Sequence, residues 1–160
     1  MWLSALTPEQ REALYGLAHN VVVSDGILDP NEEGMMDEFR REMDLNPAIE
    51  GEYLELEGID STFGTRKARI IALLNLLRLS YADGAFEIEE ECLLKEISRA
   101  FGVADAEFLL LDNWVKRLVT LEEEARDFIG GRPECASRVN PVARSQAPTV
   151  PIRSLPDPAD

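Results

Sequence analysis

Apolar residues recur at spacings of three and four along most of the first 129 residues. Such spacing places the apolar side chains on one face of a helix, so the pattern predicts a series of amphipathic helices. The predicted helices cover about 8–24, 30–43, 47–57, 65–82, 88–101 and 106–129. Because the segment 65–82 is apolar on nearly all sides, we expect it to be the central, most buried helix.

Start signals for the first two long helices agree with these boundaries. Thr7 and Gln10 form a capping box, in which the hydroxyl and the side-chain amide satisfy free backbone N–H groups. Asp29 and Glu32 repeat this signal before the second helix. Both helices are therefore expected to begin at a proline that directly follows the capping residue.

Stop signals and later start signals divide the rest of the chain. Gly26, Gly84 and Gly102 each follow an apolar helical segment and supply the left-handed residue that ends a helix. Asp105 is expected to cap the last helix. Thr120 opens another capping-box sequence, which predicts that this last helix breaks near residue 120.

Three cations lie at the start of the central helix, where the helix dipole disfavours positive charge. They are Arg66, Lys67 and Arg69. We expect them to pair with the acidic residues of the segment 50–60, or else to contact a partner.

One acidic stretch occurs twice. Asp25 to Glu33 returns 58 positions later as Asp83 to Glu91, with an Asp-Gly pair at the end of one helix and carboxylates in the first turn of the next. The apolar stripes of the following helices match at the same offset: Met36 and Leu94, Phe39 and Ile97, Met43 and Phe101. The sequence therefore predicts an all-α fold, a single bundle of about six to seven helices built from two pseudo-symmetric helix–turn–helix units.

The composition fits one folded domain followed by a tail. A chain of 160 residues with 45% hydrophobic residues can bury a substantial core, and the helical pattern ends near residue 129. Residues 1–129 are therefore expected to form the domain. Residues 130–160 hold six prolines and show no periodicity, which predicts an extended or disordered tail.

The net charge argues against one class of partner. The whole chain carries −15, and the four arginines and three acidic residues of 130–160 leave −16 on residues 1–129. Such a field repels nucleic acid and anionic lipids, and it attracts cations or basic protein surfaces. The alternative, that the charge only maintains solubility, stays open. Because signal-peptide and membrane-spanning patterns are absent from the sequence, we expect a cytoplasmic protein without direct membrane insertion.

The acidic turns have two competing explanations. Asp25 and Asp83 follow helix C-termini, where the dipole and unpaired carbonyl oxygens oppose a negative charge. In an architectural explanation, each carboxylate reaches the amide donors of the following helix. This accounts for Asp25 and Asp29 but gives no role to Glu32 and Glu90, which lie in the first turns of the following helices.

A bound cation would account for the glutamates as well. Carboxylates gathered within about 5 to 6 Å raise one another's pKa unless a cation lies among them. Carboxylates and helix-end carbonyls form an all-oxygen ligand set, which suits Ca²⁺ or Mg²⁺ better than Zn²⁺. The spacing differs from that of an EF-hand loop. The metal and the architectural explanations both stay open on these residues.

Catalytic chemistry finds little support in the residue pattern. His19 is expected to be a packed or surface residue, and Cys92 and Cys135 are expected to be reduced thiols. Phosphate-binding glycine loops, Ser-His-Asp sets and paired-cysteine metal motifs are absent from the sequence, so we expect a non-enzymatic protein. A metal-dependent hydrolase is the least favoured alternative, because Asp25 and Asp83 would have to hold two metals about 4 Å apart.

The paired turns resemble the TerB-like family, the all-helical domains of tellurite-resistance TerB proteins that also occur at the N-terminus of membrane-anchored DnaJ-like proteins. The resemblance covers residues 13–129 and includes Ser24 and Ala82 before the two Asp-Gly pairs. The family pattern has a small residue where Glu87 stands, and it does not include a Pro-rich tail.

The resemblance implies two pseudo-symmetric halves whose acidic residues gather on one face and bind a divalent metal. Carried over by position, the candidate ligands are Asp25, Asp29, Glu32, Asp83, Glu87 and Glu90. Family members are linked to tellurite and other stress resistance, to phage defence and to complexes near the inner membrane, without an assigned catalytic activity. We therefore expect an acidic helical module that binds a divalent cation, a basic protein partner or both. A protein-interaction adaptor without metal is the alternative, and the oligomeric state is left open.

Overall fold

The computed structural model describes residues 1–24, 30–81 and 88–130. Over these residues the fold is all-α, with six packed α-helices and no strand. The elements are the 3₁₀ turn η1 (Leu3–Ala5) and the helices α1 (Pro8–Val22), α2 (Pro30–Glu42), α3 (Ile59–Thr62), α4 (Arg66–Ser80), α5 (Ile88–Ala100) and α6 (Asp105–Ile129). The tail predicted for residues 130–160 lies outside the described residues from position 131 onward.

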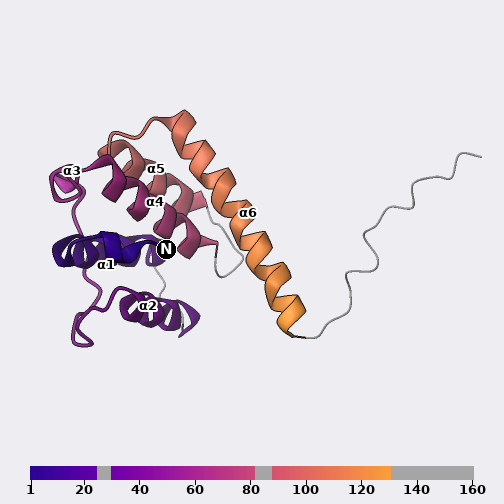
Figure 1. The fold of residues 1–160 in the computed structure, drawn as a ribbon. Coiled ribbons are helices and arrows are strands. Elements are labelled where there is room, and N and C mark those ends of the chain that lie inside the picture. The colour runs from indigo at the N-terminus through magenta and orange to yellow at the C-terminus, as the bar shows by residue number, and fades with distance from the viewer. Residues whose placement is uncertain (25–29, 82–87, 131–160) are drawn as a thin grey trace, which may run out of the picture.

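Helix α4 is the centre of the bundle, as its apolar sequence predicts. It packs against α1, α5 and α6, while α2 packs against α1 and α5 packs against α6. In Figure 1, α6 runs diagonally past α4 and α5, and its C-terminal end projects beyond the other helices. No described helix is long and apolar enough to cross a bilayer.

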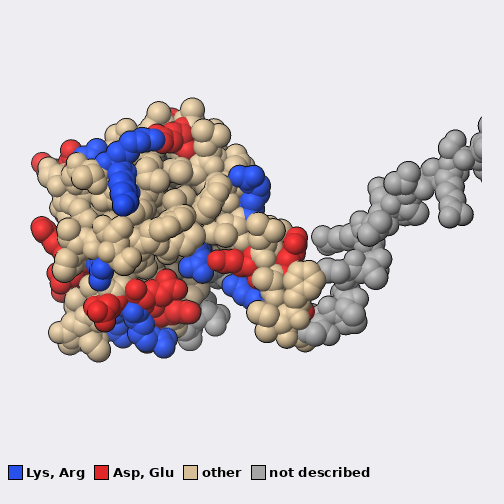
Figure 2. Space-filling view, viewed as in Figure 1, with Lys and Arg blue, Asp and Glu red and all other residues tan. Residues whose placement is uncertain are grey.

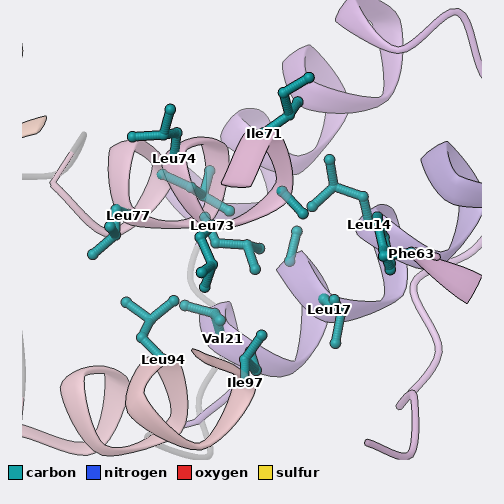
Figure 3. Packing of buried hydrophobic residues seen from close by; sticks show 14 of the residues in the cluster. Leu14, Leu17, Val21, Phe63, Ile71, Leu73, Leu74, Leu77, Leu94 and Ile97 are labelled. Atoms are coloured by element: carbon teal, nitrogen blue, oxygen red, sulfur yellow. The ribbon is translucent and has the colours of Figure 1, made fainter. Parts of the chain in front are cut away.

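One continuous hydrophobic core joins the helices. Figure 3 shows side chains of α1, α4 and α5 converging on one cluster that includes Leu17, Leu73 and Ile97. Phe63, which follows α3, packs edge-on against Phe101 at a centroid distance of 5.1 Å. The burial of these large side chains supplies most of the driving force for folding, at about 1.5–3 kcal/mol for each fully buried side chain.

The five long helices begin and end within two residues of the predicted boundaries. Thr7 caps α1 as expected, because its Oγ1 accepts from the Gln10 N–H at 3.2 Å and the Gln10 side chain accepts from the Thr7 N–H. Gly102 has a φ of 68° and follows α5 as the predicted left-handed residue. Gly26, Gly84 and the capping residue Asp29 lie outside the described residues.

Residues 47–57 form no helix, so the prediction of a short helix there is wrong. The Asn20 side chain of α1 holds this segment by both of its polar atoms: Nδ2 donates to Leu54 O at 2.6 Å, and Oδ1 accepts from Leu54 N at 2.9 Å. Gly51 lets the chain approach α1 closely, since a Cβ there would overlap the His19 ring. Bonds to a buried side chain thus replace the internal bonds that a helix would make.

Helix α6 also differs from its prediction in two respects. It runs unbroken from Asp105 to Ile129, because the Thr120 hydroxyl donates to Lys116 O at 3.0 Å within the helix instead of capping a new one. Ala104, without a side-chain bond, is the N-cap, so the prediction that Asp105 caps this helix is wrong. The linker expected between Gly58 and Gly64 contains the single turn α3.

Candidate functional site

The predicted ligands lie at the two helix–turn–helix corners, and most fall outside the described residues. This applies to Asp25, Asp29, Asp83 and Glu87, and with them to the Asp25–Asp83 separation that a two-metal hydrolase requires. Glu32 belongs to the first turn of α2 and Glu90 to the first turn of α5, where Glu90 is half-buried. Among the described residues, no group of three or more His, Cys, Asp or Glu side chains could hold a metal ion.

The helices that flank the two corners have equivalent boundaries. Each end of α4 lies 58 positions after the same end of α1, and each end of α5 lies 58 positions after that of α2. Thr7 and Thr65, also 58 apart, are the N-caps of α1 and α4, and each hydroxyl accepts a backbone N–H at 3.2 Å. The offset of the acidic turns therefore extends to the starts of the helices that precede them.

Two arginines at the same offset secure the ends of α2 and α5. Arg11 of α1 donates to Met43 O at 3.2 Å, just after α2. Arg69 of α4 donates to Phe101 O at 3.0 Å, just after α5. A guanidinium at a helix C-terminus satisfies a free carbonyl and complements the negative end of the dipole. The cap therefore ties the first helix of each pair to the far end of the second.

The chain leaves α2 and α5 through the same type of turn. Asp44 and Gly102 have φ values of 54° and 68°. The next residues, Leu45 and Val103, donate their backbone N–H groups to Arg40 O and Ser98 O at 3.2 and 2.9 Å. These are the positive φ and the long return bond of a Schellman cap.

The cations at the start of α4 were expected to pair with the carboxylates of residues 50–60 or to contact a partner. They do not pair with those carboxylates. Arg66 forms a bidentate ion pair with Glu107 of α6. Arg69 donates to the backbone oxygens of Asp60, Phe63 and Phe101. Its role is therefore to connect α3, α4 and α5 rather than to neutralise an acidic segment.

A polar network around the buried Asp112 lies where α4 ends, directly before the second acidic turn. The Tyr81 hydroxyl donates to Asp112 Oδ1 at 2.5 Å, and Lys116 Nζ donates to Asp112 Oδ2 at 2.8 Å. Burial of the phenol, together with its bond to the carboxylate, raises the pKa of Tyr81 to about 12. The network fixes the end of α4 against α6 and so positions the entry to the second turn.

Two polar atoms near the first acidic turn are buried without a hydrogen-bond partner among the described residues. They are His19 Nδ1 and Ser24 Oγ. His19 packs against Gly51, in agreement with the prediction of a packed residue. Ser24 is the last described residue before the turn. Within the described part of the chain, the first corner therefore has no counterpart of the polar network beside the second.

A pocket of mixed polar and apolar lining, with a volume of about 160 Å³, opens between α2, α4 and α6. At its centre, Arg78 lies 3.3 Å from a carboxylate oxygen of Glu122 and 4.0 Å from one of Glu42. Glu38 and Arg126 also line it. Because Arg78 is paired with acids from both neighbouring helices, it links α4 to α2 and to α6.

The sequence analysis missed the Arg11 and Arg69 caps and the Tyr81–Asp112 network. One signal for the network is present in the sequence. Asp112 occupies a position of the buried stripe of α6 where the spacing predicts an apolar residue, between Phe108 and Val115. A buried acid requires donors, and a tyrosine and a lysine supply them here. The free thiol of Cys92 is exposed on α5.

The chain was compared with protein-family models, with curated proteins and with solved structures, and none of them matched. The TerB-like resemblance therefore rests on the residues of the chain alone and stays a prediction.

Proposed function

We propose that the chain is a non-enzymatic helical module of the TerB-like kind, built from two pseudo-symmetric helix pairs whose acidic turns bind a divalent cation. The observation that carries this proposal is the offset of 58 positions. It relates the boundaries of α1 and α2 to those of α4 and α5. It also relates Thr7 to Thr65 and Arg11 to Arg69, with their backbone partners.

This equivalence supports a shared role for the two turns. Each turn joins the C-terminus of a buried helix to a first turn rich in glutamate. Carbonyl oxygens at the helix end and carboxylates from the turn are hard ligands that suit Ca²⁺ or Mg²⁺. A cation bound there would offset both the repulsion between carboxylates and their unfavourable position in the helix dipole.

An adaptor without metal is the second candidate. The charge of −16 on residues 1–129 favours a basic partner surface, which the acidic turns would contact directly. By the TerB-like resemblance, we propose that either activity serves stress or tellurite resistance, in complexes assembled near a membrane. In both cases the turns are the binding elements, so the two candidates differ only in what the carboxylates bind.

Titration with Ca²⁺, Mg²⁺, Mn²⁺ and Zn²⁺ separates the candidates. For the metal-binding module we expect heat of binding and a rise in melting temperature, because a ligand that binds only the folded state stabilises it. The paired changes Asp25→Asn with Glu32→Gln, and Asp83→Asn with Glu90→Gln, should each weaken binding at one turn. Glu96→Gln with Asp105→Asn removes the same charge outside the turns and should leave binding unchanged.

A titration in which metal has no effect would exclude the first candidate. If millimolar metal gives neither heat nor a change in melting temperature, metal binding is excluded. The adaptor then predicts that immobilised protein retains a polylysine peptide, and that the turn variants lose this retention more than the control variant does. Equal retention by all variants would exclude the turns as the docking surface.

A further inference from the structure

The C-terminal part of α6 is an exposed helix with a hydrophobic side. Leu121 is 60% exposed and Phe128 is 69% exposed, although α6 is continuous through both residues. Figure 1 shows this end of the helix standing away from the bundle. Short helices without packing contacts are marginal in water, so a projecting amphipathic end is expected to have a partner.

The exposed side chains belong to a regular stripe that is distinct from the stripe facing the core. Phe108, Asp112 and Val115 face the core. A second stripe, displaced by about 100° around the helix, follows heptad spacing for about 26 Å. Its members are Leu111, Trp114, Leu118, Leu121, Ala125 and Phe128. The first two pack partly on the body, and the last three are exposed.

A shallow apolar groove lies beside the N-terminal half of this stripe. It is lined by Trp2, Ile70, Ile71 and Leu74, with Arg66 and Lys67 also among its lining residues. Trp2 is 57% exposed, and its ring lies 6.3 Å from that of Trp114. Figure 2 shows a broad area without charged side chains over α4 and the N-terminal residues, bordered by both basic and acidic side chains. The groove and the stripe therefore form one continuous apolar surface.

We propose that this surface binds a second copy of the chain, with the two α6 helices paired antiparallel about the Leu118–Leu121 step. In this register, Leu118 of each copy meets Leu121 of the other, and Leu111 meets Phe128. The projecting end of each α6 then lies along Trp114 and reaches the groove of the other copy. The contact is two-fold symmetric, so it closes into a dimer.

Charges on the chain complement this arrangement. Arg117 and Glu124 occupy the same flanking heptad position. Antiparallel pairing therefore places Arg117 of each copy opposite Glu124 of the other. The C-terminal end of the other α6, which carries the negative end of the helix dipole, approaches Arg66 and Lys67. Among the described residues, Lys67 has no ion pair. A second copy supplies both the apolar stripe and the matching charges, which is why we infer self-association.

Sedimentation equilibrium of the full chain tests the proposal. We expect twice the mass of one chain, and dissociation on dilution over about two orders of magnitude in concentration. Leu121→Glu with Phe128→Glu should give a folded monomer, because both positions are exposed in the single chain, and its melting temperature should no longer depend on protein concentration. Tyr53→Glu, at an exposed residue outside the surface, should leave the dimer intact. A monomer at every concentration of the unaltered protein would overturn the proposal.

Charge reversal tests the antiparallel register separately. Arg117→Glu and Glu124→Arg each place like charges opposite one another, and each should weaken the dimer about tenfold. An equimolar mixture of the two variants restores both attractive pairs and should associate as tightly as the unaltered protein. If the mixture associates no better than either variant alone, the antiparallel register is wrong.

Discussion

At the scale of single residues, buried polar side chains connect elements that hydrophobic packing alone would leave free to slide. Asn20 holds the segment 51–56 against α1, and Arg69 joins the carbonyls of three segments. Asp112 is only 7% exposed, and it receives bonds from both Tyr81 and Lys116. Each group is costly to bury alone, so the partners must form together.

Replacing Tyr81 by Phe tests the network. The change leaves the buried Asp112 with one donor fewer, so we expect a loss of about 1–3 kcal/mol in the free energy of unfolding, measured by urea denaturation. Tyr53→Phe, at an exposed phenol, should have little effect. Equal stabilities for the two variants would show that the network contributes nothing.

The raised pKa of Tyr81 gives this residue a pH signature as well. Because the folded-state pKa is about 12 and an unfolded tyrosine titrates near 10, the unfolded chain loses this proton first as the pH rises. The contribution of Tyr81 to stability is therefore complete below about pH 10 and is lost between about pH 10 and 12. Burial also raises the pKa of Tyr15, so the late part of the tyrosinate absorbance of the folded protein should lose the contribution of one tyrosine in Tyr81→Phe and should be unchanged in Tyr53→Phe.

At the scale of elements, the ends of α2 and α5 use the same turn with different residues. Asp44 adopts a positive φ that favours glycine. At Gly102, an added Cβ would meet only one ordinary contact, with Arg69 Nη1 at 3.9 Å. The backbone conformation, and not crowding, therefore limits what can replace Gly102.

This difference predicts opposite effects at the two turns. Asp44→Gly should raise the free energy of unfolding by roughly 0.5 kcal/mol, and Gly102→Ala should lower it by roughly 1 kcal/mol, because an L side chain is strained at positive φ. Gly34→Ala, inside α2 where an added Cβ meets no other atom, should stabilise by about 0.5–1 kcal/mol. Thermal unfolding of the three variants checks the signs, and a stabilising Gly102→Ala would contradict the strain argument.

The long helices could be predicted because their apolar periodicity, caps and glycines agree with one another. Residues 47–57 could not, because Asn20, which is distant in sequence, supplies the bonds that hold Leu54 of this segment against α1. The prediction of a break near Thr120 was wrong because its hydroxyl bonds to Lys116 O within the helix instead of capping a new one. The side chains that hold the flanks of the candidate site, such as Arg11 and Arg69, could not be predicted, since they act across long sequence separations. The candidate ligands themselves stay a prediction.

At the scale of the whole molecule, stability is expected to fall from the centre outward. Helix α4 is covered by α1, α5 and α6, while the end of α6 beyond residue 120 is mostly exposed. Regions with few buried contacts open with little free energy, whereas a fully packed helix exchanges its amide protons only on global unfolding.

Amide hydrogen exchange should therefore be slowest in α4. In dilute protein that is kept monomeric, residues 121–129 should exchange fastest among the described helical segments, because their amides lack tertiary protection. Mass spectrometry of exchanged peptides resolves both segments. Faster exchange in α4 than in α2 would contradict its assignment as the centre of the bundle.

The contact between α1 and α4 has a consequence for the ancestry of the chain. These are the first helices of the two proposed halves, and part of the apolar face of each is buried against the other. If the halves arose by duplication of one gene segment, the ancestral half could not have buried that face alone. It would have existed as a homodimer, and fusion then converted the encounter of two chains into an intramolecular one at high effective concentration.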